Sequence, residues 1–87
     1  MDDEDLQRSE ADRMLAAAIY LMSCHARNHC PRLACMVGRH LELLGRHPGA
    51  GEHVSDTCKR LSNAWEAIRQ HDERTVRVHN DVALKLH

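Results

Sequence analysis

The stretch VSDTCKRLSNAWEAI, residues 54–68, has the clearest hydrophobic periodicity in the chain. Its apolar residues recur at alternating intervals of four and three positions, at Val54, Cys58, Leu61, Trp65 and Ile68. This spacing is typical of one face of an α-helix, because residues three and four apart are neighbours on a helix surface. We therefore predict a helix that supplies the central apolar surface of the fold, with Trp65 as a core anchor.

An earlier run of apolar residues predicts a first helix. Residues at helical spacing extend from Leu15 to Ala26, and residues 1–30 contain neither glycine nor proline. Ser9 and Asp12 have the spacing of an N-terminal capping box, in which side chains bond the free N–H groups of the first turn. The sequence therefore predicts a helix from about Ser9 to about Ala26.

A second helix is predicted over residues 31–44. Pro31 disfavours a helical conformation at the residue before it but suits the first position of a new helix. Leu33, Val37 and Leu41 then recur at helical spacing, and Gly45 occupies the position that commonly follows a helix end. The loop 46–51 contains a Pro-Gly pair and has a length that suits two antiparallel helices.

Two interpretations of the C-terminal third remain open. Asp72 stands where the stripe of residues 54–68 calls for an apolar residue, so we predict a break near residues 71–74. A fourth helix would then contain Val76, His79, Val82, Ala83 and Leu86. The alternative is one continuous helix over residues 52–86, because neither glycine nor proline occurs after Gly51.

Length and composition limit the fold and the kind of protein. The chain has 87 residues, one tryptophan, one tyrosine and no phenylalanine, so it predicts a single domain with a thin core. No apolar run approaches the roughly 18 residues of a membrane span. The sequence also lacks the evenly spaced runs of aromatic and β-branched residues that would indicate a β-sandwich or barrel. We predict an all-α protein: a small three- to four-helix bundle formed by residues 9–87 after an acidic tail, residues 1–8.

Self-association follows from the thin core. A short chain buries too little apolar surface to be more than marginally stable alone, so a second copy would add needed burial. The apolar residues of the C-terminal third exceed what one chain can cover, which predicts a homodimer. The candidate interface residues are Trp65, Val76, Val82 and Leu86.

Charge is distributed unevenly along the chain. Residues 1–12 contain six acids and one base, a net charge of −5, whereas residues 13–87 carry +4. An acidic segment and a basic body can steer the encounter with a partner. A charge of +4 without a dense Lys/Arg stripe does not favour a nucleic-acid partner.

One cluster of side chains has metal-ligand chemistry. Cys24, His25, His29 and Cys30 lie within seven residues of one another, and thiolate and imidazole are the preferred ligands of zinc. Their spacing lacks the Cys-x-x-Cys pair of common zinc sites, and a polar corner between two helices also explains them. Cys24 and Cys30 alternatively form a redox pair. We expect no other cofactor.

These features predict a small interaction or regulatory protein that presents a helical surface to a protein partner. The alternatives are a metal- or redox-responsive regulator using the Cys24–Cys30 cluster, and a DNA-associated accessory protein. The sequence contains no phosphate-binding glycine loop, nucleophile elbow or zinc-hydrolase motif, so we expect no enzyme. The acidic start does not resemble a secretory signal, which favours the cytoplasm. Ten arginines against two lysines indicate a GC-rich bacterial source.

Overall fold

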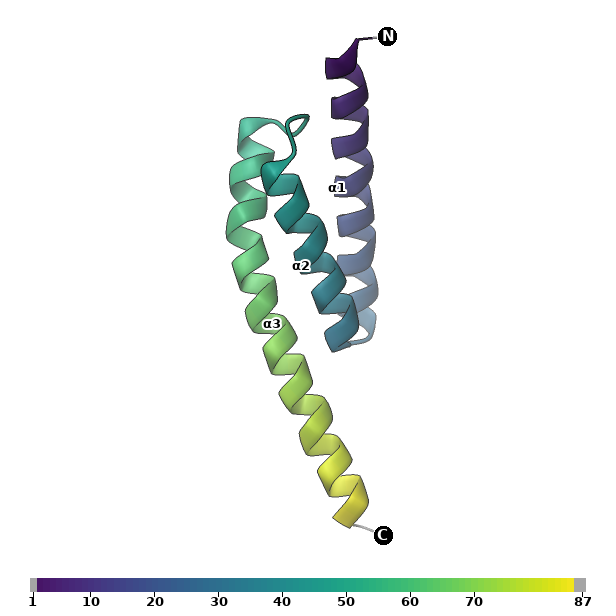
Figure 1. The fold of residues 1–87 in the computed structure, drawn as a ribbon. Helices are drawn as coiled ribbons and strands as arrows, with labels where there is room; N and C mark the ends of the chain where they lie inside the picture. The colour runs from purple at the N-terminus through teal and green to yellow at the C-terminus, as the bar shows by residue number, and fades with distance from the viewer. Residues whose placement is uncertain (1, 86–87) are drawn as a thin grey trace.

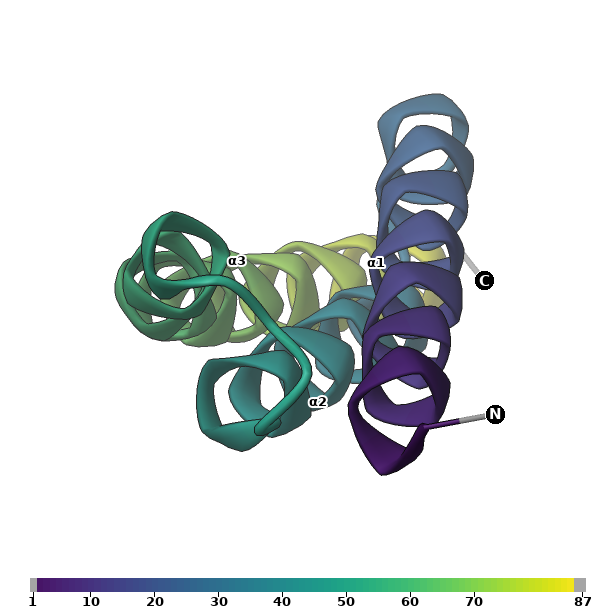
Figure 2. The ribbon, with the colours of Figure 1, turned by 90° about the horizontal axis from the view of Figure 1, so that it is seen from above.

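The computed structural model describes residues 2–85, with the side chains of residues 2–79. These residues form three helices: α1 (Asp3–Arg27), α2 (Pro31–Arg46) and α3 (Glu52–Lys85) (Figure 1). No strand occurs in this part of the chain, so the predicted all-α class is confirmed. Both α1 and α3 pack along α2. Viewed from above, α1 and α3 are apart at the first turn of α3 and approach each other farther along it (Figure 2).

The first helix begins earlier than the sequence predicted. Asp3, Glu4 and Asp5 form the first turn of α1, so the acidic stretch is part of the helix and does not precede it as a tail. Negative side chains in a first turn are favourable because they face the positive end of the helix dipole. The capping box predicted at Ser9 is wrong, because Ser9 lies in the interior of α1.

The second helix begins at Pro31, as predicted, but extends two residues beyond the predicted end, to Arg46. Gly45 is therefore a buried helical residue and not the residue that follows the helix. The Ser55 hydroxyl donates a hydrogen bond to the Gly45 carbonyl oxygen over 2.7 Å. A Cβ atom at this position would lie 2.9 Å from Cγ of Lys59. The missing side chain lets α2 and α3 approach closely.

The third helix is continuous, so the predicted break near residues 71–74 and the separate fourth helix are wrong. Asp72 is 2% exposed, and its carboxylate binds the ring of His25, so a buried partner satisfies the polar residue within the apolar stripe. Arg69 also forms ion pairs with Glu66 and Glu73, one turn away on either side. Pairs at these spacings stabilise a helix across the expected break.

The core is centred on α2 and not on the helix containing residues 54–68. The largest fully buried side chains are Val37, Leu41 and Leu44, all from α2. Of the predicted α3 stripe, Cys58 is buried, Val54 and Trp65 are partly buried, and Leu61 is 37% exposed. The α2 side chains lie between the other two helices and therefore contact both.

The molecule is elongated, measuring 62 × 20 × 15 Å. The C-terminal part of α3 projects beyond the other two helices, at the opposite end of the molecule from the start of α1 (Figure 1). The radius of gyration is 16.3 Å, against about 12 Å for a compact chain of this length. Within residues 2–85, every helix is too short or too polar to span a lipid bilayer.

Candidate functional site

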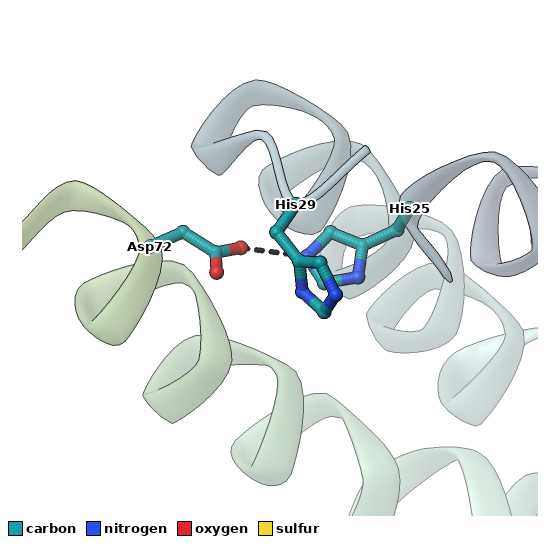
Figure 3. A group of neighbouring side chains, drawn as sticks. All are labelled: His25, His29 and Asp72. Carbon is teal, nitrogen blue, oxygen red and sulfur yellow. Dashed lines mark hydrogen bonds and ion pairs between the residues drawn. The ribbon is translucent and has the colours of Figure 1, made fainter. Parts of the chain in front are cut away.

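A buried hydrogen bond joins the end of α1 to the middle of α3. His25 and Asp72 are 5% and 2% exposed and are the two buried polar side chains of the described residues. The Nε2 atom of His25 lies 2.6 Å from Oδ2 of Asp72 (Figure 3). Burying a polar group without a partner costs free energy, so each side chain here makes the burial of the other tolerable.

Two aromatic side chains surround this pair. The Trp65 ring meets the His25 ring edge to face, with centroids 5.0 Å apart. The His29 ring approaches from another side, with its centroid 4.9 Å from that of His25. Trp65 thus lies partly buried against His25 and the core. This position agrees with its predicted role as a core anchor.

The turn after α1 places His29 at this site. Asn28 has an extended backbone, with φ −148° and ψ 98°, and its N–H donates to the carbonyl oxygens of Cys24 and His25. The chain therefore leaves the helix direction just before His29. As a result, His29 is exposed but its ring stands beside the ring of His25, near the carboxylate of Asp72 (Figure 3).

His25, His29 and Asp72 form a cluster of potential metal ligands. One ligand atom from each lies within 4.8 Å of the others. The sequence predicted the two histidines but paired them with Cys24 and Cys30, which are partly buried free thiols outside this cluster. Asp72 was missed as a ligand, although a carboxylate within an apolar stripe was a visible signal of a buried polar partner.

All four cysteines are free thiols in the structure. Cys58 is buried in α3, and burial raises the pKa of its thiol because the charged thiolate loses its hydration. Cys35 is exposed on α2. A raised pKa makes Cys58 a poor nucleophile, which agrees with its interpretation as a small core residue.

An apolar groove lies between α1 and α3. Leu41 of α2 lines it, and Ile19 of α1 and Leu61 of α3 remain 58% and 37% exposed along it. Its volume is about 340 Å³. The other lining residues are Leu15, Met22, His53, Val54, Thr57 and Cys58. Most of the groove's lining is therefore apolar, and part of this lining is exposed to solvent.

Two other predicted interface residues, Val76 and Val82, lie on the projecting part of α3. Val76 is 41% exposed and Val78 is 61% exposed. The side chain of Val82 and the whole of Leu86 lie outside the described residues. A shallow hollow on this segment is lined by His71, Arg74, Thr75, Val78 and His79.

Comparisons with known proteins add no family: no protein-family model, no curated protein and no solved structure matches the chain.

Proposed function

We propose that the protein is a helical interaction protein that forms a homodimer, in which a second copy covers the groove between α1 and α3. The observation that carries the proposal is the groove itself. Its exposed Ile19 and Leu61 lie beside the buried Leu41, so apolar side chains at the edge of the core meet solvent at this face. Covering the groove removes this apolar surface from water, which favours association.

The exposed area of the chain supports a second copy. The structure exposes 6624 Å², against about 5,200 Å² for a compact monomer of this mass. The excess is about 1,400 Å², whereas a standard interface removes about 800 Å² from each partner. The excess area of each copy is therefore larger than the area that each copy buries in a standard dimer.

The charge distribution favours an antiparallel dimer. Residues 1–12 carry −5, whereas residues 74–87 contain three bases and one acid. The described parts of these two segments, residues 2–12 and 74–85, lie at opposite ends of the molecule (Figure 1). An antiparallel two-fold pairing brings each acidic end near the projecting α3 segment of the other copy, so both ends gain an attraction.

In this proposal the protein acts by binding and not by catalysis. The antiparallel dimer buries the groove and presents the remaining faces of its helices to a protein partner. We place it in a reducing compartment such as the cytoplasm, where cysteines remain thiols.

A lysine in the groove tests the proposal. We expect Ile19→Lys to give a monomer, because a charge at the centre of an apolar interface loses its hydration without gaining a partner. Leu43→Lys is the matched control, because Leu43 is 53% exposed but lies on α2 outside the groove. Sedimentation velocity measures the association, and circular dichroism checks that both variants remain helical.

The expected result is a monomeric Ile19→Lys variant beside a dimeric wild type and a dimeric control. A dimeric Ile19→Lys variant would show that the copies meet at a surface other than the groove. A monomeric wild type would refute the homodimer, and a second copy would then not be what covers the groove.

A further inference from the structure

We infer that His25, His29 and Asp72 form a binding site for a divalent transition metal such as Zn²⁺, which joins the end of α1 to the middle of α3. This site goes beyond the proposed homodimer. Its three ligands belong to one chain and lie outside the α1–α3 groove. Metal binding can therefore be tested independently of dimer formation, and the failure of one proposal does not refute the other.

The donor set fits zinc. Two imidazole nitrogens and one carboxylate oxygen are common zinc ligands, with metal–ligand distances near 2.0–2.2 Å. A tetrahedral site with such bonds separates its ligand atoms by about 3.3 Å. Here the three ligand atoms lie within 4.8 Å of one another. The longest separation therefore has to shorten by up to about 1.5 Å, and the exposed His29 has room to move. The 2.6 Å contact between Nε2 of His25 and Oδ2 of Asp72 has to widen by about 0.7 Å, with the metal replacing the proton that the two atoms share.

Two of the ligands are already held in place. His25 and Asp72 are buried, come from different helices and are 2.6 Å apart at Nε2 and Oδ2. Trp65 packs against the His25 ring and limits its rotation. Such preorganisation lowers the cost of assembling a site, because little side-chain entropy remains to be lost.

The exposure of His29 determines what kind of site this is. The other two ligands are shielded, so His29 forms the side of the cluster that meets solvent. A fourth ligand then comes from water, which leaves three protein ligands and one open position. Zinc sites that have this composition exchange the fourth ligand.

His29 also makes it possible to distinguish a metal site from a purely structural pair of His25 and Asp72. The hydrogen bond between His25 and Asp72 is complete without a third residue. A structural pair therefore does not depend on His29, whereas a metal site does. Since His29 is exposed, its replacement by glutamine leaves the helices and the core unchanged.

The test is a titration of the untagged, reduced full-length chain with Co²⁺ and then Zn²⁺. Visible absorption reports the coordination of Co²⁺, and quenching of Trp65, the single tryptophan, reports its position, because Trp65 contacts His25. We expect one Co²⁺ per chain with the intense visible bands of tetrahedral coordination, strong quenching of Trp65, and displacement by Zn²⁺.

Three variants identify the ligands. His29→Gln should weaken binding at least tenfold, since loss of even a supporting residue costs 10–100-fold. His79→Gln is the matched control, because His79 is an exposed histidine on α3 outside the cluster. The double replacement Cys24→Ser and Cys30→Ser should leave the affinity unchanged.

Several results would overturn the inference. It is wrong if the chain binds no Co²⁺ or Zn²⁺, or if His29→Gln binds as tightly as the wild type. Equal losses in His29→Gln and His79→Gln would show general binding by surface histidines. Loss of the metal on replacing Cys24 and Cys30 would assign the site to the thiols.

Discussion

Asp72 determines how the long third helix meets the first. Its carboxylate is 2% exposed and has one hydrogen-bonding partner among the described side chains, the ring of His25. A buried polar pair is costly to break, because removing one partner leaves the other buried and unsatisfied. Replacing both partners by apolar residues removes this penalty, since neither group then needs hydration.

We predict that the effects of replacing His25 and Asp72 on the free energy of unfolding are strongly coupled. Asp72→Leu or His25→Leu alone should lower the free energy of unfolding by about 3 kcal/mol. The double variant should be more stable than either single variant, because two leucines bury apolar surface between α1 and α3. Urea unfolding of the four proteins measures the coupling. Additive losses would show that the two side chains do not depend on each other.

At the level of elements, α2 is the helix on which the other two depend. Val37, Leu41 and Leu44 are fully buried, and α2 packs against both of its neighbours. Neighbouring positions on this helix differ sharply: Leu44 is 0% exposed and Leu43 is 53% exposed. One helix therefore offers a buried leucine and an exposed leucine in adjacent positions.

We predict that Leu44→Ala lowers the free energy of unfolding by about 2–5 kcal/mol, because it removes apolar contacts and leaves a cavity. Leu43→Ala should change it by about 0.5 kcal/mol or less, as is usual for a surface residue. Chemical denaturation followed by circular dichroism measures both. Equal effects at the two positions would place the core elsewhere than on α2.

The helices themselves could be predicted from local signals. The periodic runs indicated α1, α2 and the first part of α3, and Pro31 indicated the start of α2. The errors came where a tertiary contact overrides a local signal. Gly45 resembles a helix end but lies in the helix, where it makes room for α3. The Ser9 capping box was not used, because α1 begins at Asp3.

The candidate site was only half predictable for a similar reason. His25 and His29 are close in sequence, so local spacing was enough to group them. Asp72 is 47 residues from His25, and only the packing of α3 brings the two together. Asp72 was therefore interpreted as the sign of a helix break, because sequence alone does not show the partner of a buried carboxylate.

At the scale of the whole molecule, the elongated shape and the uncovered groove both leave surface exposed to solvent. A chain of 87 residues that is 62 Å long exposes more surface than a compact domain of its size. Its acidic end and its projecting α3 segment lie at opposite ends. In the proposed homodimer, an antiparallel second copy covers the groove and brings opposite charges together at both ends.

The measurement that tests this account most directly is sedimentation equilibrium of the wild-type chain at low and high salt. We predict a mass of twice the 9.9 kDa of one chain. Association should weaken at high salt, because salt screens the attraction between exposed charges, but it should persist, since the groove is apolar. A mass of 9.9 kDa at every protein concentration would contradict the homodimer.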